Sequence, residues 1–106
     1  MKVSTIGKSG ISASVVGIGT AGIQEAPSET SVSDKEIIKI IHAAIDKGVN
    51  LIDTAPSYGW GRAERIVGQA ISDRSDGVII ATKCGVLLDD RRGSFCLLYT
   101  SPSPRD

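Results

Sequence analysis

Apolar positions along the chain fall into two kinds of pattern. Short continuous apolar runs occur at Val15–Ile18, Leu51–Ile52 and Val78–Thr82, each bounded by glycine or polar residues, which is typical of buried strands. Between them, over residues 33–47 and 62–72, apolar side chains recur every three or four positions and predict two amphipathic helices. The alternation of strands and helices predicts parallel strand pairing through right-handed crossovers.

The ends of these elements carry their own signals. Ser33, with Glu36 three positions later, forms the sequence pattern of a capping box, and Gly48 is a suitable helix stop. Near the start, two short runs flank the turn-forming residues Gly7–Gly10 and predict a β-hairpin. The expected fold is therefore α/β, with an N-terminal hairpin followed by about three parallel strands and two helices.

Charge and composition exclude several classes of partner. The formal net charge is zero, with 12 basic and 12 acidic residues, so we expect neither a nucleic acid nor a membrane surface as partner. No apolar run has the length of a membrane span, and the N-terminus lacks the apolar segment of a secretory signal. Two widely separated cysteines make neither a disulfide framework nor a zinc site. We expect a cytoplasmic protein without a bound metal.

One glycine-rich stretch, Gly17–Gly22, has the letter pattern of a dinucleotide-binding loop. That mechanism requires a helix to begin at the loop, and here Pro27 and a Ser/Glu/Thr-rich run delay the helix to about Ser33. Asp53 also lies well beyond the spacing of about 20 residues expected for the ribose-binding acid. We therefore favour a strand that ends tightly and is followed by a surface loop.

Three polar residues stand at or just after predicted strand ends: Asp53, Tyr58 and Lys83. If the second and third strands are neighbours, Asp53 and Lys83 lie side by side and Tyr58 reaches over from the intervening loop. A lysine beside a phenol favours the phenolate, and a carboxylate keeps that lysine charged and oriented. Such a tyrosine suits proton transfer during carbonyl reduction. The alternative is an Asp–Lys ion pair that braces two strand ends, with Tyr58 only packing.

The stretch from Asp53 to Glu64 reads Asp-Thr-Ala-Pro-Ser-Tyr-Gly-Trp-Gly-Arg-Ala-Glu, with Gly48-Val49-Asn50 before it and Ala81-Thr82-Lys83 after it. These segments resemble the aldo-keto reductase family, and the similarity covers Met1 to about Ser94. The resemblance implies a (β/α)₈ TIM barrel. It also implies an oxidoreductase that transfers hydride between NADP(H), in some members NAD(H), and a small-molecule carbonyl, alcohol or sugar.

Carried over by position, the resemblance assigns roles to five residues. Tyr58 would be the general acid/base and Lys83 would activate it. Asp53 would hold Lys83 and border the nicotinamide, and Gly19 and Thr20 would lie near the cofactor. For the neighbouring Trp60, lining of the substrate pocket and packing on its own scaffold both remain open.

A complete barrel of this kind needs about 250 residues, and the chain has 106. The family's fourth catalytic residue is a histidine on the fourth barrel strand, and His42, within the first predicted helix, does not match it. We interpret His42 as a partly exposed helix residue. Residues 1–95 are therefore expected to form the N-terminal part of a reductase barrel that is inactive by itself. The alternative is a non-catalytic binding or channel-associated module.

The last residues, Cys96 to Asp106, have no helical or strand period and include Ser-Pro-Ser-Pro. As a peptide, this run resembles the translation of a transposase-type sequencing adaptor. We expect a non-native, disordered tail; the alternative is a genuine disordered tail.

Overall fold

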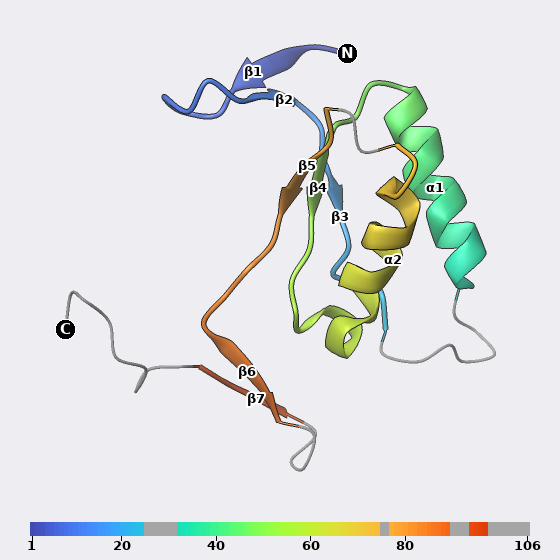
Figure 1. Ribbon diagram of the computed structural model, residues 1–106, viewed down its shortest axis with the longest axis vertical. Coiled ribbons are helices and arrows are strands. Elements are labelled where there is room, and N and C mark those ends of the chain that lie inside the picture. Colours follow the sequence, from blue (N-terminus) through green and yellow to red (C-terminus); the bar gives the residue numbers. More distant parts are fainter. Residues whose placement is uncertain (25–31, 75–76, 90–93, 98–106) are drawn as a thin grey trace.

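The computed structural model describes residues 1–24, 32–74, 77–89 and 94–97. The chain forms an N-terminal hairpin, a three-stranded sheet with two helices on one of its faces, and a second hairpin (Figure 1). The strands are β1 Val3–Thr5, β2 Ser12–Ser14, β3 Ile18–Gly19, β4 Leu51–Asp53, β5 Ile79–Ala81, β6 Val86–Asp89 and β7 Ser94–Leu97. The helices are α1 Asp34–Asp46, α2 Arg62–Ile71 and a short 3₁₀ helix, η1, at Tyr58–Gly61.

The central sheet is parallel and has the order β3-β4-β5, as the alternating pattern predicts. Gly19 lies opposite Asp53, and Asp53 lies opposite Ala81, so the three strands end at the same level. Because all three run in one direction, the residues that follow them meet at a single edge of the sheet. This edge carries the candidate site.

The core lies between the sheet and the helices. It consists of one isoleucine from α1, one from β4 and three residues from α2: Ile41, Ile52, Ile66, Val67 and Ala70. These five side chains are almost wholly excluded from solvent. Their positions are those of the apolar helix stripes and of the short strand run, so the hydrophobic pattern of the sequence is what selects this packing.

Helix α1 begins as its sequence predicts. The Ser33 hydroxyl accepts a hydrogen bond from the Glu36 amide at 3.3 Å, and the Glu36 carboxylate accepts one from the Ser33 amide at 3.2 Å. This reciprocal capping box satisfies two amides that the helix itself leaves unpaired. Farther along α1, His42 is half-buried, and its Nε2 lies 2.7 Å from the carbonyl oxygen of Ala70. The histidine therefore joins α1 to α2, in agreement with a structural role.

The prediction of a sheet strand at Val15–Ile18 is wrong for the first half of that run. Only Ile18 and Gly19 pair with β4, whereas Val15 and Val16 are 58% and 55% exposed. The amide of Val15 donates to the carbonyl of Lys2 at 3.0 Å, so this part of the chain still belongs to the N-terminal hairpin. As predicted, no helix begins at Gly17–Gly22: residues 20–24 are not helical, and α1 begins at Asp34. The rest of the expected loop, residues 25–31, lies outside the described residues.

The second hairpin is not predicted from the sequence. β6 and β7 pair antiparallel, with Leu87 opposite Cys96 and Asp89 opposite Ser94. The expectation that Cys96 and Leu97 belong to a structureless tail is therefore wrong for these two residues. The rest of that expected tail, residues 98–106, lies outside the described residues. Within the described part of the chain, no helix is long and apolar enough to cross a bilayer.

Candidate functional site

Asp53 and Lys83 meet at the edge where the parallel strands end. Asp53 is the last residue of β4, and Lys83 follows the end of β5 by two residues. The Lys83 Nζ donates to both oxygens of the Asp53 carboxylate, at 3.1 and 3.2 Å, and to the carbonyl oxygen of Thr54 at 3.0 Å. The parallel register creates this contact, because Asp53 and Ala81 are paired across the two strands. The predicted proximity of Asp53 and Lys83 is confirmed.

Tyr58 completes the cluster from the loop after β4. The Lys83 Nζ lies over the Tyr58 ring, 4.9 Å from its centroid, within the range of a cation–π contact. Tyr58 is half-buried, whereas about half of the side-chain surface of Asp53 and of Lys83 is open to solvent. The predicted approach of Tyr58 to the strand ends is thus confirmed. The aromatic ring, the ammonium and the carboxylate form one contiguous group.

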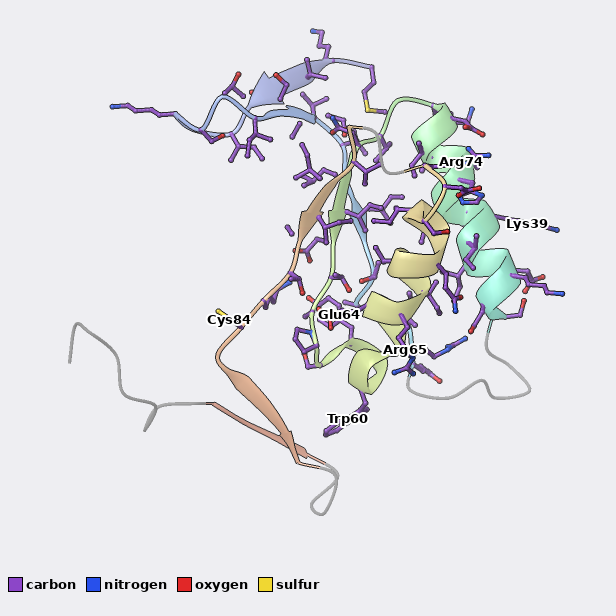
Figure 2. The ribbon with its side chains drawn as sticks, viewed as in Figure 1. Lys39, Trp60, Glu64, Arg65, Arg74 and Cys84 are labelled. Atoms are coloured by element: carbon purple, nitrogen blue, oxygen red, sulfur yellow. The ribbon has the colours of Figure 1, made fainter. Side chains whose placement is uncertain are left out.

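The backbone that carries Tyr58 is unusual. The φ values are positive at three successive residues: 58° at Gly59, 54° at Trp60 and 97° at Gly61. Positive φ is disfavoured for residues with a side chain. Glycine adopts it without steric cost, but Trp60 does so against its intrinsic preference. Figure 2 shows Trp60 extending from this turn away from α2. A turn of this shape places Tyr58 against Lys83 while α2 begins only four residues later, at Arg62.

The neighbours of Lys83 stabilise its charged form. The Asp53 carboxylate, by its hydrogen bond, raises the pKa of Lys83 above the ordinary value of 10.5, and partial desolvation opposes this. The oxygen of Tyr58 raises the pKa of Lys83 further. The hydrogen bonds of Nζ nevertheless go to Asp53 and Thr54, and the ring face of Tyr58 is what Nζ contacts. At neutral pH, Lys83 is therefore a fixed cation beside the phenol.

Gly19 and Thr20 lie at the same edge, beside Asp53, but they differ in what they offer. Thr20 is buried, and both its amide and its hydroxyl donate to the carbonyl oxygen of Asp53, at 3.1 and 3.0 Å. It thus supports the residue that holds Lys83. At Gly19, an added Cβ would meet no atom within 4 Å, so the strand end is open there. The open strand end at Gly19 and the half-exposed Asp53 carboxylate therefore lie side by side at this edge.

Sequence reasoning missed a second contact that reaches the cluster. The Thr82 hydroxyl donates to the Glu64 carboxylate at 2.7 Å, joining the first turn of α2 to the residue before Lys83. Both side chains line a groove of about 210 Å³ with Thr54, whose buried hydroxyl has no hydrogen-bond partner. The only sequence signal was that Thr82 and Glu64 stand beside a predicted strand end and a predicted helix start. Cys84, the next residue after Lys83, is exposed (Figure 2).

Most of the chain is similar in sequence to known proteins of one family. The model of the aldo/keto reductase family matches residues 15–101. The aldo-keto reductase YhdN of Bacillus subtilis is 45% identical over 85 residues, which are 78% of this chain and 25% of that protein. The NADH-specific methylglyoxal reductase of Escherichia coli is 41% identical over 96 residues, 89% of this chain and 29% of that protein.

A solved structure extends the similarity to the fold. The aldo-keto reductase AKR11C1 of Bacillus halodurans, in its holo form, superimposes with a TM-score of 0.79 and 26% sequence identity. The alignment covers 92% of this chain and 30% of that one. The sheet and helices described above are thus part of a (β/α)₈ barrel, as predicted, and the chain spans between a quarter and a third of the length of these relatives. This chain belongs to the aldo/keto reductase family.

Proposed function

We propose that this chain is the N-terminal part of an NAD(P)H-dependent oxidoreductase that interconverts aldehydes or ketones and alcohols. The observation that carries the proposal is the contact of Lys83 with both Asp53 and Tyr58 at the carboxyl edge of the parallel strands. In barrels of parallel strands, this edge is where catalytic groups gather. An ion pair that served only to brace the strands would not need a tyrosine ring against its ammonium group.

Each residue of the cluster has a separate task in this proposal. Tyr58 gives its proton to the carbonyl oxygen of the substrate during reduction and takes it back during oxidation. Lys83 stabilises the phenolate that is left, because a neighbouring cation favours the charged form of the phenol. Asp53 keeps Lys83 protonated and fixes its position through the two hydrogen bonds to Nζ. A bound nicotinamide cofactor supplies or accepts the hydride at the carbonyl carbon.

Gly19, Thr20 and Asp53 form the described part of the cofactor site in this proposal. Gly19, where the strand end is open, and the half-exposed Asp53 carboxylate would hold the nicotinamide. Thr20 fixes the position of Asp53 through its two hydrogen bonds to the Asp53 carbonyl oxygen. We propose NADP as the cofactor, with NAD as the alternative, since the E. coli relative is NADH-specific by name. The substrates are small carbonyl compounds or sugars, and the protein works in the cytoplasm.

The proposal is tested by restoring a complete barrel. Residues 15–95 replace the matching segment of the B. subtilis relative, and the chimera is assayed for NADPH- and NADH-dependent reduction of small aldehydes. We expect turnover by the chimera, its loss in the Tyr58→Phe chimera, and no turnover by the 106-residue chain alone. A folded chimera whose activity survives Tyr58→Phe would refute the assigned role of Tyr58.

The 106-residue chain provides the second arm of this test. Robust reduction of aldehydes by the chain alone, abolished by Tyr58→Phe, would show that these residues suffice and that the proposed dependence on a complete barrel is wrong. A defined oligomer of the chain without activity, seen by size-exclusion chromatography, would instead support a non-catalytic module. Lack of activity in a chain that forms no defined oligomer is the result expected for part of an enzyme.

A further inference from the structure

Arg62 is a buried cation outside the catalytic cluster. It is the first residue of α2, and only 5% of its surface is exposed. A charged side chain is rarely buried to this extent unless its hydrogen bonds are satisfied. The sequence gives no hint of this burial, because Arg62 stands at the polar start of an amphipathic helix.

The partners of Arg62 come from three separate places in the chain. Its Nε and Nη2 donate to one carboxylate oxygen of Asp34, at 3.1 and 2.5 Å, and so tie α2 to the first residue of α1. Its Nη1 donates to the carbonyl oxygen of Gln24 at 3.1 Å, and Nη2 also donates to that of Val32 at 3.4 Å. The guanidinium therefore fixes the backbone on both sides of residues 25–31.

The same backbone supports the turn that carries Tyr58. A Cβ added at Gly59 would lie 2.7 Å from the carbonyl oxygen of Ile23 and 2.8 Å from that of Gln24, so the two backbone segments are in close contact. Gln24 thus contacts Arg62 on one side and Gly59 on the other. A shift of Gln24 would be transmitted to Gly59 and to its neighbour Tyr58, because a packed contact of this kind leaves no room for independent movement.

We propose that Arg62, held by Asp34, is a positioning residue for Tyr58. It acts through the carbonyl of Gln24 and the backbone of Gly59, and it sets the distance between the Tyr58 ring and Lys83. The importance of that distance for catalysis rests on the function proposed above, but the geometric coupling itself does not. A second ion pair, between Arg74 and Asp46 at the last residue of α1, is partly exposed and offers a comparison. Figure 2 shows Arg74 at the opposite end of α2 from Trp60, so this pair is not in contact with the turn.

The coupling has a spectroscopic readout that needs no activity. Lys83 lies over the Tyr58 ring, so the ring current shifts the NMR signals of the Lys83 ε-protons upfield. In the 106-residue chain, we expect Arg62→Met to abolish this shift and Asp34→Ala to reduce it. Arg74→Met and Asp46→Ala, the matched controls, should leave it unchanged. Methyl signals of Ile41 and Ile52 report whether the core is still formed in each variant.

Each outcome decides the proposal. Loss of the ring-current shift in Arg62→Met with the core signals retained supports it, and an unchanged shift in both Arg62→Met and Asp34→Ala overturns it. If Arg62→Met fails to fold, Asp34→Ala decides, since the Asp34 side chain is about half exposed and lies outside the core cluster. A wild-type chain without a ring-current shift also overturns the proposal. Failure of the Tyr58→Phe test in the chimera would instead refute the catalytic role and leave this coupling standing.

Discussion

Asn50 and Ser14 hold one another by a reciprocal pair of hydrogen bonds. The backbone amide of Ser14 donates to the side-chain Oδ1 of Asn50 at 2.7 Å, and the backbone amide of Asn50 donates to the Ser14 hydroxyl at 3.0 Å. The Asn50 Nδ2 also donates to the carbonyl oxygen of Ser12 at 3.1 Å. Asn50 immediately precedes β4, so this one side chain joins the N-terminal hairpin to the central sheet.

Replacing Asn50 by alanine should therefore loosen the hairpin before the sheet. Each partly buried polar group that loses its partner costs about 1–3 kcal/mol, and a free energy of about 1.4 kcal/mol is a tenfold change in an equilibrium constant. We expect the hairpin amides that are protected in β1 and β2 to exchange with solvent at least about tenfold faster. The measurement is hydrogen exchange followed by NMR.

Ser9→Ala is the control for this experiment. The Ser9 hydroxyl donates to the carbonyl of Ile6 at 2.6 Å in the exposed turn of the same hairpin. Its loss should change the exchange of β1 and β2 amides little, because water replaces the bond. Equal effects of the two variants would show that Asn50 is not the link between hairpin and sheet.

The second prediction concerns the protonation of Lys83. Asp53 is the largest cause of its raised pKa, so Asp53→Asn should move the pKa back toward 10.5. Because the folded-state pKa lies above the unfolded one, the stabilising contribution is fully present at neutral pH and is lost as the pH rises through the folded-state pKa. An NMR titration of the Lys83 ε-carbon measures the pKa of Lys83 in the original chain and in the Asp53→Asn variant. The Asp46→Asn variant, in the other exposed ion pair, should leave the pKa of Lys83 unchanged.

A third prediction follows from the proposed division of labour between Tyr58 and Lys83. In the chimeric barrel, Tyr58→Phe should lower kcat by about 10²–10⁴-fold, the usual contribution of a general acid or base. Lys83→Met should lower kcat as well, with a smaller change in KM. Because the two residues act as a unit, the double variant should be no worse than about the poorer single one. Multiplicative losses in steady-state kinetics would mean that Lys83 does not act through Tyr58.

Two adjacent isoleucines of α1 offer a matched test of the core. Ile41 is 1% exposed and packs in the central cluster, whereas its neighbour Ile40 is 58% exposed. Ile41→Ala should lower the free energy of unfolding by about 2–5 kcal/mol through lost burial and the cavity left behind. Ile40→Ala should change it by less than about 0.5 kcal/mol. Urea denaturation followed by circular dichroism measures both, and similar losses for the two would contradict this assignment of the core.

The elements that could be predicted are those with strong local signals. The Ser33–Glu36 capping box marks the start of α1, and the spacing of Ile66, Val67 and Ala70 gives the buried face of α2. β4 and β5 follow from short apolar runs, and their parallel register then brings Asp53 to Lys83. This part of the site was predictable because the rule that joins parallel strands is independent of side-chain detail.

The features that the sequence did not predict depend on contacts between residues that are far apart in the chain. An apolar pair such as Val15–Val16 looks like strand wherever it occurs, and only its hydrogen bonds to the hairpin show otherwise. β6 and β7 flank a polar stretch of sequence, residues 90–93, that ends in glycine and is typical of a hairpin connection. The burial of Arg62 depends on Asp34, 28 positions earlier. No local pattern encodes such a contact.

The outer edge of β5 bears on how any longer chain beginning with these residues is made. Among the described strands, β5 pairs on one side only, and its exposed Ile80 lies next to a groove lined by Val67 and Ile71. A ribosome that has released only this much polypeptide presents the same open strand to the cell. Such an edge can pair with another nascent chain. In the synthesis of such a longer chain, this edge would stay open to chaperones and to other nascent chains until a further strand pairs with it.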